Sequence, residues 1–189
     1  MPGQFNDKLK AEYNPPFKWK LVSPLSFTSD EITDDDAFVL KRIDMENDFS
    51  KDGTIGYTVT APIGFETNLA SVPRLFWNIM SPWDIARSAV IHDFLYWNCA
   101  KAYPKLLHND SDIGELTWRD ARKISDKIFR LAMRCSEPNV PAWKIGTAYY
   151  AVRMFGGKPA RTIDGAEKSE EKKEEKHEEH SWENEGGKN

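Results

Sequence analysis

The run AVIHDFLY at residues 89–96 places three polar side chains inside a stretch that is otherwise apolar and helix-forming. In a helix, His92 and Tyr96 are one turn apart and project to the same side, whereas Asp93 is rotated by about 100° from His92. Burying a histidine beside a carboxylate costs free energy unless both groups find partners. The run therefore predicts a buried helix whose polar groups serve either a structural network or a reaction.

Capping signals around this run predict two helices joined by a polar connection. Ser81 is suited to cap the first helix and Pro82 to occupy its first position, and we expect this helix to end at about Ala100. Residues 117–120 (TWRD) have the outline of a capping box and predict the start of a second helix. The run HNDSD at 108–112 is then expected to lie in an exposed linker.

The second helix carries one acidic residue within its apolar pattern. Asp126 interrupts this pattern and is a candidate partner for His92, because a carboxylate there would orient the imidazole and stabilise its protonated form. If the two helices are antiparallel with this pair in register, the thiols of Cys99 and Cys135 lie about 24 Å apart along the axis. That separation predicts free cysteines rather than a disulfide.

The first third of the chain has the two-residue period of half-buried strands. Apolar and polar residues alternate over 17–21 and again over 55–63. The same alternation changes phase within 38–45, which predicts a strand with a bulge or bend. Asp52 and Gly53 are expected to form the turn that leads into the strand at 55–63.

The order of the predicted elements indicates an α+β protein. A third helix is predicted from Pro141 to Gly156, so a small N-terminal antiparallel sheet is followed by a three-helix unit. We expect a single domain over residues 1–157, with strands in 16–66 and helices in 81–157.

The charged residues of the 189-residue chain are unevenly distributed. The chain has 26 Lys and Arg against 30 Asp and Glu, a net charge of −4. Residues 167–189 hold nine acidic residues and five Lys, so the whole excess lies there. The rest of the chain is neutral, which argues against a nucleic-acid binder. Residues 158–189 are expected to form a disordered charged tail that aids solubility or contacts a basic partner.

The sequence shows neither a secretory signal nor a membrane-spanning helix. Residues 1–17 (MPGQFNDKLKAEYNPPF) lack the apolar stretch of a signal, and apolar runs elsewhere never approach about 20 residues. We therefore expect a soluble protein. The sequence leaves its oligomeric state open.

An ordered set of motifs resembles a family of tailed phages and prophages known as domain of unknown function 1353. The motifs are PIGFETNLASVPR at 62–74, AVIHDFLY at 89–96, a helix containing Asp126, and YAVRMFG at 150–156. The resemblance covers roughly residues 55–157 and implies a phage or prophage origin, with the protein in the host cytoplasm or the virion. The chain departs from that family's pattern at Asn68, where an Asp is typical.

The pattern HDxxY at 92–96, followed by Asp126, is also similar to the phospholipase A2 signature, particularly its bacterial and parvoviral capsid forms. This resemblance implies that His92 is a general base that activates water, with Asp126 orienting it and Tyr96 supporting Asp126. It further implies a Ca²⁺ ion held by Asp93 and by backbone carbonyls near Gly64 and Asn68. The ion would polarise the ester carbonyl, as a hard cation with oxygen ligands can.

Other functions remain open beside this one. The same four polar residues suit a structural network in a non-enzymatic virion or assembly protein. A peptidoglycan hydrolase is a third possibility, but it would want a Zn²⁺ site, for which the body offers only His92 and His108 as histidine ligands. Large apolar side chains between the strands and helices suit a phospholipid surface, a protein contact or the core. They are Leu75, Phe76, Trp77, Ile79 and Trp83.

Overall fold

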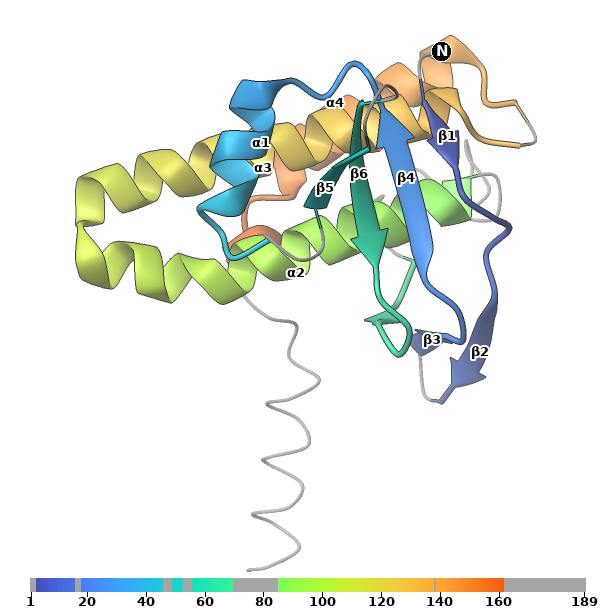
Figure 1. Cartoon of the computed structure of the whole chain (residues 1–189), viewed down its shortest axis with the longest axis horizontal. Helices are drawn as coiled ribbons and strands as arrows, with labels where there is room; N and C mark the ends of the chain where they lie inside the picture. The colour runs from blue at the N-terminus through green and yellow to red at the C-terminus, as the bar shows by residue number, and fades with distance from the viewer. Residues whose placement is uncertain are drawn as a thin grey trace, which may run out of the picture.

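The computed structural model of the chain describes residues 3–15, 18–45, 49–52, 56–69, 85–137 and 139–161 (Figure 1). Within these ranges the protein has an α+β fold, as predicted, with two antiparallel sheets preceding a set of long helices. The predicted helix start at Ser81 and Pro82, the apolar run from Leu75 to Trp83, and most of the predicted tail lie outside the described residues.

Seven short strands form the two sheets. The four-stranded sheet has the order β1-β4-β6-β5 and the three-stranded sheet the order β2-β3-β7. Their bounds are β1 Gln4–Phe5, β2 Ala11–Asn14, β3 Lys18–Leu21, β4 Leu25–Ser29, β5 Phe49–Asp52, β6 Gly56–Ala61 and β7 Glu66–Thr67. In the longest pairing Phe27 lies opposite Val59, and both side chains are buried. The strands predicted at 17–21 and 55–63 correspond to β3 and β6, which belong to different sheets.

The strand predicted over residues 38–45 is wrong, because this segment contains a helix, α1 (Asp34–Lys41). Thr33 caps the helix in a complete capping box, with its hydroxyl accepting from the Asp36 amide and the Asp36 carboxylate accepting from the Thr33 amide. Three acidic residues in the first turn stabilise the positive end of the helix dipole. The phase change therefore marks the end of a helix and not a bulge, because Phe38 and Leu40 lie in α1 while Ile43 and Met45 follow it.

Two long helices form a hairpin. Helix α2 (Ala86–Asn109) and helix α3 (Ser111–Arg134) are separated by Asp110 alone, whose carboxylate accepts from the amides of Asp112 and Ile113. The predicted end at Ala100 and the capping box at 117–120 are therefore wrong, and the exposed connection predicted at 108–112 is confirmed in place but consists of Asp110 alone. Pro104 lies inside α2, and Thr117 lies inside α3 with its hydroxyl donating to the Ile113 carbonyl.

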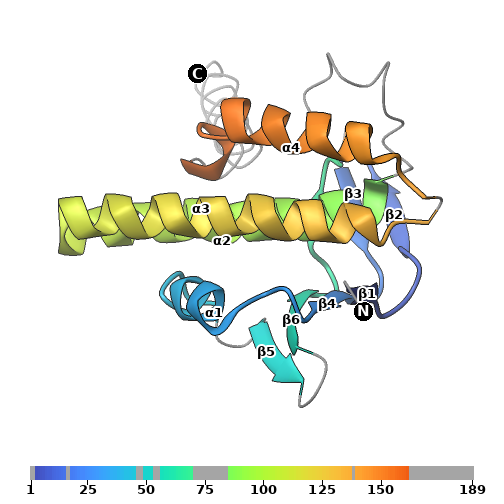
Figure 2. The ribbon, with the colours of Figure 1, turned by 90° about the horizontal axis from the view of Figure 1, so that it is seen from above.

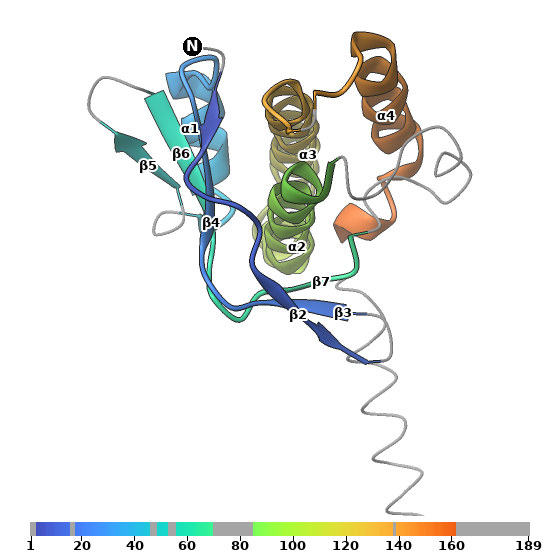
Figure 3. The same ribbon diagram turned by 90° about the vertical axis from the view of Figure 1, so that its right-hand side faces the viewer.

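The hairpin lies in the middle of the molecule. The four-stranded sheet and α1 cover one side, and helix α4 (Ala142–Phe155) packs on the other (Figures 2 and 3). Helix α4 begins after Pro141 and ends at Gly156, as predicted. No helix in the described part of the chain is long and apolar enough to span a membrane. Cys99 and Cys135 are both free, as predicted.

The body continues beyond residue 157, where the sequence predicted the tail to begin. Pro159–Arg161 form a 3-10 turn, and Ala160 is fully buried. The Trp118 indole donates to the Ala160 carbonyl at 2.8 Å. This contact ties the segment that follows α4 back onto α3.

Candidate functional site

The hairpin brings the predicted pair of polar residues into direct contact. The Nε2 atom of His92 on α2 lies 2.9 Å from the Oδ1 atom of Asp126 on α3, although 34 residues separate them. The side chains are 1% and 0% exposed. The contact depends on the antiparallel hairpin, which sets the first half of α2 against the second half of α3.

Two further groups hold the Asp126 carboxylate. The Tyr96 hydroxyl donates to Oδ1 at 2.7 Å, and the Arg153 guanidinium on α4 donates to Oδ2 at 2.7 Å. Arg122 reaches from α3 to α4, where it donates to the carbonyls of Val152 and Arg153. Its Nε atom also lies 3.4 Å from the Tyr96 hydroxyl. Three helices therefore converge on one buried carboxylate.

These contacts decide the charge state of the site. Burial alone would raise the pKa of Asp126, but hydrogen bonds from His92, Tyr96 and Arg153 outweigh it and hold that pKa below the ordinary value. Burial, together with the negative charge of Asp126, raises the pKa of Tyr96. Asp126 is therefore an anion and Tyr96 a neutral donor at neutral pH.

The second nitrogen of the imidazole has no partner among the residues that the structure describes. The Nδ1 atom of His92 is buried there without a hydrogen bond. The ring lies 4.0 Å from the Tyr96 ring and 4.6 Å from the Phe129 ring, measured between centroids. The hydrogen bond to the carboxylate places a proton on Nε2, so Nδ1 is the nitrogen that can carry a lone pair. A buried acceptor without a partner costs free energy, which a purely structural histidine would avoid.

The Asp93 side chain lies on a different side of α2 from that of His92 and contacts Thr67. Its Oδ2 atom accepts a hydrogen bond from the Thr67 hydroxyl, which in turn accepts from the Leu69 amide at 3.0 Å. Of the predicted Ca²⁺ residues, Gly64, with a φ of +84°, lies in the turn before β7, and Asn68 directly follows that strand. Oxygen donors of this kind fit Ca²⁺ chemically. The described residues hold no group of three or more His, Cys, Asp or Glu side chains, so backbone carbonyls would have to supply most ligands.

A small apolar cavity adjoins this turn. It measures about 110 Å³ and is lined by Leu9, Ala11, Trp19, Thr67, Leu69 and Val90. Val90 precedes His92 by two residues on α2. The volume is somewhat below that of an apolar cavity that binds benzene, about 150 Å³, so it suits a short alkyl segment.

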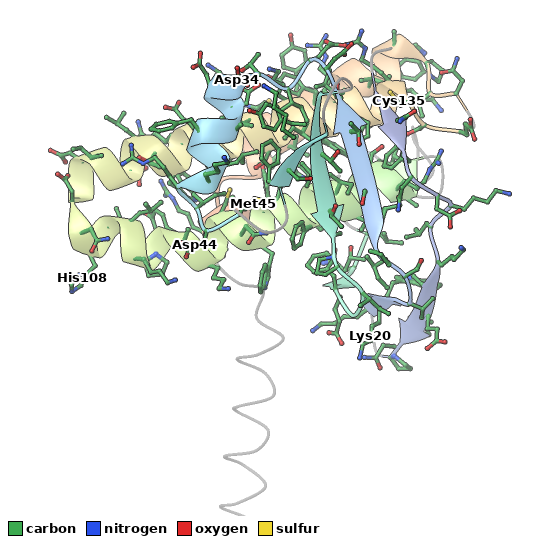
Figure 4. All side chains as sticks on the ribbon, viewed as in Figure 1. Lys20, Asp34, Asp44, Met45, His108 and Cys135 are labelled. Carbon is green, nitrogen blue, oxygen red and sulfur yellow. The ribbon has the colours of Figure 1, made fainter. Side chains whose placement is uncertain are left out.

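The zinc site of a peptidoglycan hydrolase finds no support in the placement of the histidines. His108 lies at the free end of the hairpin (Figure 4), sixteen residues beyond His92 on the same helix. At 1.5 Å per residue the two are about 24 Å apart along the axis. They cannot ligate one ion.

Sequence reasoning missed three of the residues that complete the site. Arg153 and Arg122 hold Asp126 and the end of α4, and Thr67 holds Asp93. Arg153 stood in the quoted motif at 150–156, and its charge within the otherwise apolar run 148–155 was the signal that was available. No sequence signal pairs Thr67 with Asp93, because β7 and α2 meet only in the tertiary structure.

The end of α4 gives a test of how tightly the site is packed. A Cβ atom on Gly156 would collide with the Tyr96 hydroxyl and the Val152 carbonyl, whereas one on Gly146 would meet nothing within 4 Å. We expect Gly156→Ala to destabilise the protein by about 1–3 kcal/mol, since overpacking displaces Tyr96. Gly146→Ala, in the same helix, should stabilise by about 0.5–1 kcal/mol. Urea denaturation measures both, and equal effects of the two would contradict the packing described.

Comparison with known proteins gives one match. The model of a family described as "Protein of unknown function (DUF1353)" matches residues 43–152, which include His92, Asp93, Tyr96 and Asp126. Arg153 lies one residue beyond the matched range. No curated protein and no solved structure matches the chain. The resemblance to phospholipase A2 therefore stays a prediction.

Proposed function

The chain belongs to the DUF1353 family of proteins of unknown function, and we propose that it hydrolyses lipid esters with His92 as the general base. One observation carries the proposal. The imidazole is held by Asp126 through Nε2 at 2.9 Å, while Nδ1 is buried and has no hydrogen-bond partner in the described part of the chain. This is the arrangement of a general base whose tautomer is fixed by a carboxylate.

The steps of the proposed reaction depend on which ring nitrogen of His92 carries a proton and which carries a lone pair. Nδ1 removes a proton from a water molecule as the water oxygen attacks the ester carbonyl carbon. The imidazolium that forms is stabilised by the Asp126 carboxylate on its other side. As the tetrahedral intermediate collapses, the bond between the carbonyl carbon and the ester oxygen breaks, and Nδ1–H returns the proton to the leaving alkoxide. Tyr96 and Arg153 act on Asp126 and are positioning residues.

Two features support a lipid as the substrate. The cavity of about 110 Å³ beside Thr67 is lined mainly by apolar side chains. It adjoins the hydrogen bond from Thr67 to Asp93, so an alkyl segment in it would lie close to the turn at 64–68. Apolar pockets with a few polar groups at one side are typical of small-molecule sites.

In the proposed mechanism, Asp93 is the side chain that would bind Ca²⁺. The carboxylate of Asp93 and backbone carbonyls near Gly64 and Asn68 would hold the ion, which supplies polarisation of the ester carbonyl when bound. We expect fatty-acid release to require Ca²⁺ and to fall to background in Asp93→Asn. This substitution keeps the shape of the side chain and its acceptor for Thr67. Release that is unchanged by chelator would remove calcium from the mechanism and leave the general base in place.

The test of the activity itself uses the full chain. We expect it to release fatty acid from phospholipid vesicles and to cleave a soluble short-chain ester when Ca²⁺ is present. Folding of the sample is checked by circular dichroism. A folded protein that gives only the rate of the protein-free control with both substrates would refute the proposal.

A second candidate is a non-enzymatic virion or assembly protein in which the same residues form a structural network. The observation that favours it is the complete burial of the pair, with 1% and 0% of the two side chains exposed. A phage or prophage origin, which the ordered motifs at 62–74, 89–96 and 150–156 imply, suits both candidates. A folded but inactive protein would favour this second candidate.

A further inference from the structure

Helix α4 is apolar on two opposite sides, and one of them is exposed in the part of the chain that the structure describes. Its inner side places Ile145, Ala148 and Val152 in a buried cluster with Phe129 and Met133 of α3. Its outer side carries Trp143, Tyr150 and Met154, which are 61%, 66% and 73% exposed. At 100° per residue these three fall within about 40° of one another on the helix surface. We call them the outer stripe.

A stripe of this kind requires an explanation. A helix that is apolar all round is normally buried on every side. Single exposed apolar residues are common, but a contiguous group on one face marks an interaction surface. Phe155 is also exposed, at 55%, but it lies about 120° from Trp143 around the helix and is not part of the stripe.

The charges around the stripe indicate what covers it. Residues 139–161 contain four basic residues and no Asp or Glu, and two of the four are ion-paired, Arg153 with Asp126 and Arg161 with Glu115. The Lys144 ammonium lies 5.7 Å from the centre of the Trp143 ring, and Arg130 of α3 lies 5.3 Å from that of the Tyr149 ring. Basic residues beside Trp and Tyr are the composition of segments that rest on anionic lipid surfaces. A second copy of the chain, packed by two-fold symmetry, would instead bring these like charges together.

We propose that the outer stripe of α4 docks the protein onto an anionic phospholipid surface, with Trp143, Tyr150 and Met154 entering the interface and Lys144 meeting the lipid headgroups. The proposal rests on the proposed function only in its choice of a lipid as the partner. Through Arg153, whose guanidinium lies 2.7 Å from Asp126, the docking helix also holds the candidate site.

The experiment measures binding without hydrolysis. The full chain is floated with vesicles made of equal parts phosphatidylcholine and phosphatidylglycerol. The hydrocarbon chains of these lipids are joined by ether bonds, so they contain no carboxylic ester to cleave. We expect the triple variant Trp143→Ser, Tyr150→Ser, Met154→Ser to lower the vesicle partition coefficient by at least about tenfold. Lys144→Glu should lower it by about tenfold, and added salt should weaken wild-type binding.

The matched control lies at the free end of the hairpin. Ile113 and Leu116 of α3 are 53% and 60% exposed, so the double variant Ile113→Ser, Leu116→Ser removes similar apolar surface elsewhere. We expect it to bind vesicles as the wild type does. Absence of wild-type binding, or equal losses in the control and triple variants, would overturn the proposal. So would a wild-type dimer, measured by sedimentation, that the triple variant abolishes.

Parallel assays with a soluble short-chain ester separate this proposal from the proposed function. Vesicle binding that depends on the stripe, without ester cleavage, would support the docking surface and refute the hydrolase. Ester cleavage without vesicle binding would do the reverse. The triple variant should retain cleavage of the soluble ester, because none of its three residues contacts His92 or Asp126.

Discussion

Replacing His92 with Gln is expected to lower the rate of ester hydrolysis by a factor of about 10²–10⁴, the range that a positioned general base contributes. Gln keeps an N–H group that can donate to Asp126, so the buried carboxylate retains a partner on α2. It lacks the basic lone pair that Nδ1 supplies. The measurement is the initial rate of fatty-acid release at saturating substrate.

The control for this prediction is His108→Gln, the same substitution on the same helix. His108 is exposed at the free end of the hairpin (Figure 4). We expect the His108→Gln variant to hydrolyse the ester at the wild-type rate. If His92→Gln folds and retains the wild-type rate, His92 is not the base. The structural network would then be the better description of the pair.

Replacing Asp126 with Ala is expected to reduce the free energy of unfolding by about 3 kcal/mol, at the lower end of the cost of breaking a buried ion pair. The substitution leaves the buried His92 Nε2 and the Tyr96 hydroxyl without their acceptor. Arg153, whose side chain is 31% exposed, can turn toward solvent and so limits the cost. Total stabilities of domains are about 5–15 kcal/mol, so the loss should be obvious in urea denaturation.

Asp120→Ala serves as the control, because Asp120 is an exposed residue of the same helix. We expect it to change the unfolding free energy by less than about 0.5 kcal/mol. Equal effects of the two substitutions would show that the network around Asp126 does not stabilise the fold.

Comparing the wild type with Asp126→Ala also tests the protonation of Asp126. Its pKa in the folded state is lowered, so its contribution to stability is present above the ordinary carboxyl pKa of about 3.9 and is lost as pH falls through the folded value. The difference in stability between the wild type and Asp126→Ala should therefore be constant near neutral pH and shrink in acid. A difference that grows as pH falls would contradict the direction of the shift.

Local sequence patterns predicted the structure correctly where the spacing of apolar residues fitted a helix and excluded a strand, or the reverse. The apolar run around His92 predicted a buried helix, and the proline and glycine at 141 and 156 marked both ends of α4. The local patterns failed where helix capping by individual side chains decided the local structure. Thr33 and three acidic residues make a helix of a segment whose apolar pattern suggested a strand. Asp110 alone reverses the chain where a long linker was expected.

The sequence by itself determined the α+β class, the strand-rich first third followed by long helices, and the choice of His92 and Asp126 as partners, because residue type and helical spacing limit which groups can be buried together. Only the tertiary structure decided that Arg153, Arg122 and Thr67 complete the site, and that His92 Nδ1 has no partner among the described residues. These facts depend on the contact of segments far apart in the chain. A local pattern carries no information about which distant side chain occupies the remaining space, so packing alone could settle it.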